Sequence, residues 1–167
     1  MHDVFELKPI TARAVPEAIK KAEHYRLLNE PEQAESICRD VLEAEPGNQH
    51  VLTVLVLALT DQFGRDGSAA GLRQAQEAMA QLTDAYQLHY YGGLVLERRA
   101  RAMLGRRTSR GSAYSYFRDA MERYEQAECI RPEGDDSAIL RWNACVRAIE
   151  REKLEPPAPD EREQPLE

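Results

Sequence analysis

The chain has 167 residues, of which 43% are hydrophobic and 31% are charged, and its formal net charge is −7. This length and composition are typical of one domain with a sizeable core, and no apolar run approaches the ~20 residues that a membrane span needs. The opening residues MHDVFELKPI contain no basic stretch followed by an apolar one, and the three cysteines lack C-x-x-C spacing. These patterns argue against a signal peptide, a disulfide framework and a thiolate zinc site, so we expect a cytoplasmic protein.

Residues 1–15 show no clear period and are interpreted as an N-terminal arm, and Pro16 is suited to the first turn of a helix. Beyond it, apolar residues recur at helical spacing between turns rich in Gly, Pro and Asn. Residues 51–59 (VLTVLVLAL) also fit a strand, but the helical segments around them favour a helix. We predict an all-α domain over residues 16–154 with about seven helices. The first three are expected at 17–28, 31–44 and 49–62. A glycine-rich loop at 64–68 follows, and the fourth helix runs from the end of this loop to residue 83. The last three are expected at 84–104, 112–130 and 136–154.

Three alanines predict close contacts between helices. Each is followed by an apolar residue four positions on and by another three positions further on; the sets are Ala34–Cys38–Val41, Ala75–Met79–Leu82 and Ala120–Tyr124–Ala127. A small residue that recurs on alternate helices allows two helices to cross closely each time. The pattern therefore predicts an α-solenoid, in which helical hairpins stack on one another.

The chain resembles the tetratricopeptide repeat family. In the first hairpin, Ala22, Tyr25, Ala34 and Pro46 stand at the family's spacing within its 34-residue unit. The third hairpin repeats the second half of the motif with Ala120, Tyr124, Ala127 and Pro132, whereas the middle hairpin lacks a closing proline. The three alanines recur after 41 and 45 residues instead of 34, and the extra length falls mainly in loops within hairpins. The resemblance covers residues 15–134, with residues 135–154 expected as a capping helix.

The resemblance implies a short right-handed superhelix whose concave groove, formed by the first helix of each pair, binds an extended peptide or a partner helix. One subgroup of the family holds a C-terminal carboxylate with lysine and asparagine side chains. The corresponding positions here are Ile19, Glu23 and Val54, so that clamp is absent. Residues on the first helices, offset from the packing stripe, are predicted to line the groove: Arg26, His50, Thr53, Leu57, Tyr90, Leu94, Glu97, Arg98, Arg101 and Arg147.

Residues 97–111 (ERRARAMLGRRTSRG), the basic segment, carry six arginines and one glutamate, a net charge of +5 in a chain of −7. Arginine favours bidentate pairing with carboxylate or phosphate, so the segment fits an acidic or phosphorylated protein partner. Nearby tyrosines leave a nucleic-acid-binding role open, although the acidic chain opposes it. The arginines also fit a plain structural role near a helix C-terminus. They are Arg98, Arg99, Arg101, Arg106, Arg107 and Arg110.

No catalytic constellation is visible. The four histidines form no close ligand pair, and the sequence GRDGSAAG at 64–71 lacks the lysine and threonine of a phosphate loop, so we expect neither metal nor cofactor. Cys38 and Cys145 fall on packed faces, and Trp142 is expected to seal the end of the stack. Residues 155–167 are acidic and rich in proline and are predicted to be a disordered tail. We expect a non-enzymatic adaptor or scaffold, with a nucleic-acid-associated factor or a self-assembling structural subunit as alternatives.

Overall fold

The computed structural model describes residues 5–66, 69–106 and 109–159. Across these ranges the chain forms only helices, turns and irregular segments, which confirms the predicted all-α class. Apart from the one-turn α4, the helices match the seven predicted ones in number and order. They are α1 (Val15–Leu27), α2 (Pro31–Ala44), α3 (Gln49–Asp61), α4 (Phe63–Asp66), α5 (Ala69–Ala80), α6 (Ala85–Met103), α7 (Arg110–Cys129) and α8 (Ser137–Glu152), after a 3-10 turn at Ala12–Ala14.

The differences from the predicted boundaries lie at loops and at helix ends. The expected loop at 64–68 begins instead inside α4, because the ring of Phe63 is buried and holds this turn of helix against the core. The next helix, α5, begins at Ala69, before Gly71, and ends at Ala80 instead of residue 83. The helical region also begins earlier than residue 16, since the buried Val15 is the first residue of α1.

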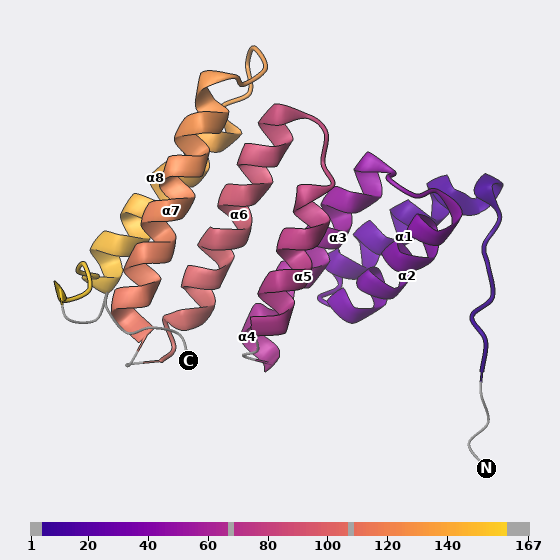
Figure 1. Ribbon diagram of the computed structural model, residues 1–167, viewed down its shortest axis with the longest axis horizontal. Coiled ribbons are helices and arrows are strands. Elements are labelled where there is room, and N and C mark those ends of the chain that lie inside the picture. The colour runs from indigo at the N-terminus through magenta and orange to yellow at the C-terminus, as the bar shows by residue number, and fades with distance from the viewer. Residues whose placement is uncertain (1–4, 67–68, 107–108, 160–167) are drawn as a thin grey trace.

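The helices lie side by side in chain order, from α1 at one end to α8 at the other (Figure 1). Consecutive long helices contact each other, and α1 also contacts α3, α3 contacts α6, and α6 contacts α8. These four helices therefore form one layer, which we call the inner layer. It contains the first helix of each expected hairpin and the expected capping helix, while α2, α5 and α7 pack against it.

The turns between helices follow from residues that tolerate a left-handed backbone. Asn29, at φ 59°, reverses the chain between α1 and α2, and Pro31 opens α2. Gly47, at φ 78°, does the same between α2 and α3. There the side chain of Asn48 accepts a hydrogen bond from the Val51 amide at 3.0 Å and caps α3. Both turns lie where the Asn and Pro-Gly signals of the sequence place them.

The core forms two adjoining hydrophobic clusters. The first joins α1 to α5, and the second joins α7 and α8. The helix α6 belongs to both, through Val95 in the first and Ala100 in the second. The three marker alanines, Ala34, Ala75 and Ala120, are all 0% exposed, which confirms their predicted burial between helices.

The helices α6 and α7 cross most closely at Gly93. A Cβ atom on Gly93 would lie 2.7 Å from the ring of Tyr124 and 3.1 Å from the carbonyl oxygen of Ala120. A Cβ atom on the preceding residue, Gly92, would meet only ordinary contacts at 3.8 Å or more. Of these two adjacent glycines, Gly93 therefore occupies the close crossing.

Substitution of Gly93 by alanine should therefore destabilise the fold. We expect Gly93→Ala to lower the free energy of unfolding by about 1–3 kcal/mol, because the new methyl group forces Tyr124 or the backbone of α7 to move. Gly92→Ala is the matched control and should gain up to about 1 kcal/mol from its higher helix propensity. Urea unfolding followed by circular dichroism measures both changes, and equal stability of the two variants would contradict the close crossing.

Candidate binding surface

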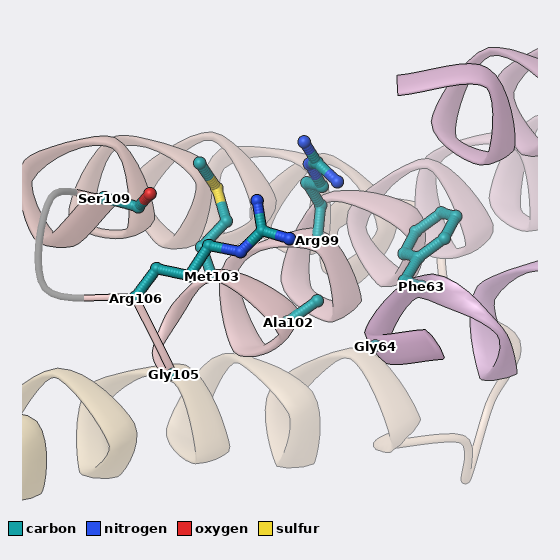
Figure 2. Close-up of a pocket in the computed structure, with 8 residues that line it drawn as sticks. All are labelled: Phe63, Gly64, Arg99, Ala102, Met103, Gly105, Arg106 and Ser109. Atoms are coloured by element: carbon teal, nitrogen blue, oxygen red, sulfur yellow. The ribbon is translucent and has the colours of Figure 1, made fainter. Parts of the chain in front are cut away.

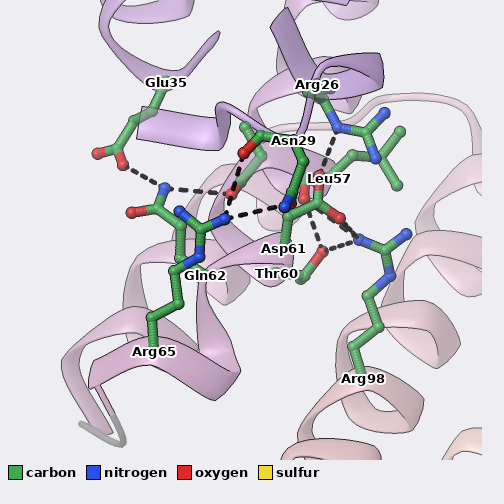
Figure 3. A network of polar contacts seen from close by, with 10 residues as sticks. Arg26, Asn29, Glu35, Leu57, Thr60, Asp61, Gln62, Arg65 and Arg98 are labelled. Atoms are coloured by element: carbon green, nitrogen blue, oxygen red, sulfur yellow. Dashed lines mark hydrogen bonds and ion pairs between the residues drawn. The ribbon is translucent and has the colours of Figure 1, made fainter. Parts of the chain in front are cut away.

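Two carboxylates, each flanked by two arginines, organise the inner layer. The first is Asp61, at the end of α3. Its Oδ2 atom accepts a hydrogen bond from the Nε atom of Arg26 on α1 at 2.8 Å, and its Oδ1 atom pairs with Arg98 on α6 (Figure 3). Arg98 also donates to the hydroxyl of Thr60 at 2.8 Å and to the carbonyl oxygen of Leu57 at 3.3 Å. One carboxylate thus ties α1, α3 and α6 together.

The second carboxylate is Glu97, which is 0% exposed. Its Oε1 atom lies 2.9 Å from Arg101, one turn further along α6, and 3.5 Å from Arg141 on α8. Its Oε2 atom accepts a hydrogen bond from the hydroxyl of Tyr124 on α7 at 2.6 Å. A buried carboxylate is stable only when paired and hydrogen-bonded, and Glu97 meets both conditions with groups from three helices.

These contacts correct part of the predicted groove. Leu94 and Glu97 are buried, and Thr53 is 8% exposed with its hydroxyl bonded to the carbonyl oxygen of His50, so none of the three presents its side chain to a partner. The helices that carry them, α3 and α6, each contact at least four other helices, so little of their surface beside the packing stripe is exposed. Of the other predicted positions, Leu57 and Tyr90 are half-buried, and Arg147 is exposed.

The remaining predicted groove residues serve ion pairs. Arg26 and Arg98 share Asp61, and Arg101 pairs with Glu97 while lying 5.6 Å from the ring centre of Phe117. His50 is exposed, and its Nε2 atom lies 2.7 Å from Glu23 on α1. The structure thus gathers these residues on the inner layer, largely as links between helices.

A hollow of about 490 Å³ opens where the first turns of α6 lie beside the start of α8. Three tyrosines of α6 dominate it. The ring of Tyr90 stacks on Tyr86, with centres 5.9 Å apart, and meets the ring of Tyr91 edge-on at 5.2 Å. We call this the tyrosine hollow; its lining is Asp84, Tyr86, Gln87, Tyr90, Tyr91, Pro132, Asp135 and Ser137.

The polar rim of the tyrosine hollow is held in place locally. Asp84 caps α6 by accepting a hydrogen bond from the Gln87 amide at 2.9 Å, and Asp135 accepts one from the Ser137 amide at 2.9 Å. The bonds from Ser137 keep the pKa of Asp135 below its usual value. Burial, followed by the nearby carboxylate of Asp135, raises the pKa of Tyr86 to about 12. At neutral pH Tyr86 is therefore a neutral phenol beside the ionised carboxylate of Asp135.

The basic segment divides into residues with different roles. Arg98 and Arg101 pair with the two inner-layer carboxylates, and Arg110 donates to the carbonyl oxygen of Glu152. Arg99 and Arg106 line a separate small cavity beside α4. Arg107 lies outside the described residues.

Sequence reasoning missed Asp61 and Tyr86. Asp61 is the only residue of α3, QHVLTVLVLALTD, with a formal charge at neutral pH. A lone charge at the end of an apolar helix needs a partner, and that signal was available in the sequence. Tyr86 precedes Tyr90 by four residues and so shares its helix face, which also could have indicated a paired aromatic site.

Comparison with family models, with curated proteins and with solved structures finds no match to this chain. Among the described residues, none of the helices has both the length and the apolarity required to cross a bilayer. The same residues contain no group of three His, Cys, Asp or Glu side chains placed to hold a metal ion.

Removal of the Glu97 side chain should lower the stability of the folded protein. Glu97→Ala leaves two arginines and a buried tyrosine hydroxyl without their partner, and we expect a loss of about 3–5 kcal/mol in the free energy of unfolding. The control is Glu17→Ala, which breaks an exposed pair with Lys20 and should leave stability unchanged. A thermal or urea melt compares the two, and a Glu97→Ala protein as stable as the control would refute the role of the buried carboxylate.

Thiol reactivity tests the packing of the two clusters. Burial raises the pKa of both Cys38 and Cys145 to about 12, whereas Cys129 is exposed. Because the thiolate is the reactive form, we expect an aromatic disulfide reagent at pH 8 to label only Cys129 rapidly in the folded protein. All three thiols should react at similar rates in urea. Equal rates for the three in the native protein would show that the clusters are open.

Proposed function

We propose that the chain is a non-enzymatic protein-interaction module whose inner layer receives a segment of another protein. The tyrosine hollow is the observation that carries this proposal. Its volume lies within the range of small-ligand pockets, and it is lined by aromatic rings with polar groups at the edge. Aromatic pockets of this kind hold the anchoring side chains that dominate protein interfaces.

The expected ligand is an extended segment that packs one apolar or aromatic side chain into the hollow against Tyr86, Tyr90 and Tyr91. The acidic groups Asp84 and Asp135 at the edge favour a basic residue next to that anchor. The hydroxyl groups of the half-buried tyrosines can donate or accept hydrogen bonds with the backbone of the segment.

Rigidity of the inner layer supports this function. Asp61 joins α1, α3 and α6, and Glu97 joins α6, α7 and α8, so that the tyrosine-bearing helix is fixed on both sides. A scaffold held in this way loses little conformational entropy when a partner binds. The resemblance to tetratricopeptide repeats supports the same reading, and the right-handed superhelix with a concave groove forms part of this proposal.

Paired arginines weaken the case for nucleic acid as the partner. Arg98 and Arg101 already neutralise carboxylates, so they add little to the positive field of the basic segment. The net charge of −7 opposes a polyanion as well.

A library of short random peptides displayed on phage tests the proposal. We expect selection on the full chain to enrich peptides with an aromatic or aliphatic residue beside a basic one, and Tyr90→Ser to weaken their binding at least about tenfold, the loss expected for an anchor pocket. Leu27→Ser, at an exposed apolar residue of α1, is the control and should bind as the wild type does.

Fluorescence polarisation with the enriched peptides measures both variants, and circular dichroism verifies that each is folded. Enriched peptides that bind Tyr90→Ser and the wild type equally would refute the tyrosine hollow as the site, and a failure to enrich any peptide would count against a peptide-binding module.

A further inference from the structure

Two arginines of the basic segment have no partner in the part of the chain that the structure describes. Arg99 and Arg106 form no ion pair with any carboxylate whose side chain the structure describes, and they donate no hydrogen bond to a described carbonyl oxygen at the end of α6. The Nε atom of Arg99 is buried and unsatisfied. A buried guanidinium donor without an acceptor is costly, so these residues differ from the paired Arg98 and Arg101.

Both arginines line the same cavity, which has a volume of about 240 Å³. We call it the arginine pocket. It lies between α4 and the last turns of α6, and Figure 2 shows the guanidinium groups of Arg99 and Arg106 in its middle, with Ser109 at one end and Phe63 at the other. Its lining is Phe63, Gly64, Arg99, Ala102, Met103, Gly105, Arg106 and Ser109.

The positive charges that line the arginine pocket favour the binding of an anion. Two guanidinium groups at one cavity repel each other unless a negative group lies between them, and the lining residues that the structure describes include no carboxylate. Each guanidinium offers several N–H donors in a planar fork, and the hydroxyl of Ser109 adds another donor. A ligand with two negative charges and three oxygen atoms can use all of these donors.

We propose that the arginine pocket binds a phosphate monoester. Its dianionic phosphoryl group balances the charge of two arginines, and its three oxygens can accept hydrogen bonds from both guanidinium groups. A carboxylate carries only one charge and two oxygens. The apolar wall of Phe63, Ala102 and Met103 suits the carbon group that carries the phosphate. The cavity is smaller than typical pockets for drug-sized ligands, which fits a phosphorylated side chain or a small phosphate ester.

This site is independent of the proposed function, because it uses the C-terminal end of α6 and the tyrosine hollow uses the N-terminal end. An NMR titration of the full chain with phenyl phosphate, inorganic phosphate and acetate at pH 7.5 and constant ionic strength tests it. We expect phenyl phosphate to bind most tightly and to shift the Nε–H signal of Arg99 and the amide signals of Gly64, Gly105 and Ser109.

Arg99→Gln and Arg106→Gln should each weaken phenyl phosphate binding at least about tenfold, the loss expected for a charge-assisted hydrogen bond. The matched control is Arg73→Gln, which makes the same change of charge at an exposed arginine of α5 and should leave binding unchanged. Tyr90→Ser should also retain phosphate binding, so that failure of this site and failure of the proposed function remain distinguishable.

The inference is overturned if acetate binds as tightly as phenyl phosphate, or if the Arg106→Gln protein, altered at an exposed side chain, binds as well as the wild type. Equal affinity for inorganic phosphate and phenyl phosphate would overturn the assignment to an ester. Tighter binding of a phosphotyrosine peptide than of phenyl phosphate would support the site with a peptide as its source, and equal affinity of the two would support it with a small ester.

Discussion

The close approach of α6 and α7 at Gly93 is the constraint on which the rest of the structure depends. The ring of Tyr124 occupies the space that a side chain at position 93 would fill, and its hydroxyl reaches Glu97 one turn further along α6. Packing at the crossing therefore positions the only hydroxyl that bonds to this carboxylate among the described residues. Glu97 in turn pairs with Arg101 and Arg141. Because Gly93 has no side chain, Tyr124 can reach Glu97, and the hydrogen bond and ion pairs that join α6, α7 and α8 depend on that approach.

Consecutive residues of α6 then join the two halves of the molecule. Glu97 belongs to the cluster with α7 and α8, while Arg98 reaches Asp61, which also holds Arg26 of α1. The hydrophobic clusters divide in the same way, with Val95 in the first and Ala100 in the second. The helix that carries the tyrosine hollow is thus fixed by polar and apolar contacts on both sides, which is the property that a preorganised docking surface requires.

The helices were predictable from the sequence because their signals are local. Alanine spacing, Asn and Pro-Gly turns and apolar periodicity placed every long helix within a few residues of its position. The candidate site was less predictable because exposure depends on partners that are distant in the sequence. Glu97 was predicted to line the groove, and only its contacts with Arg141 and Tyr124, which are distant in the sequence, show that it is buried. The tyrosine hollow likewise needs the turn before α8, which the sequence does not place beside α6.

Arginines of the basic segment that look equivalent in the sequence differ in whether a carboxylate of the fold already neutralises them. Arg98 and Arg101 stand three residues apart and face carboxylates, so their charge serves the fold. Arg99 lies between them on another face of α6, beside the one-turn α4, where Phe63 lines the same cavity. Because of the helical period, neighbouring arginines of the basic segment face different surroundings. Arg98 and Arg101 pair with carboxylates, whereas Arg99 faces the arginine pocket. Binding specificity in such a segment follows from the residues that the fold leaves unneutralised, and not from its total charge.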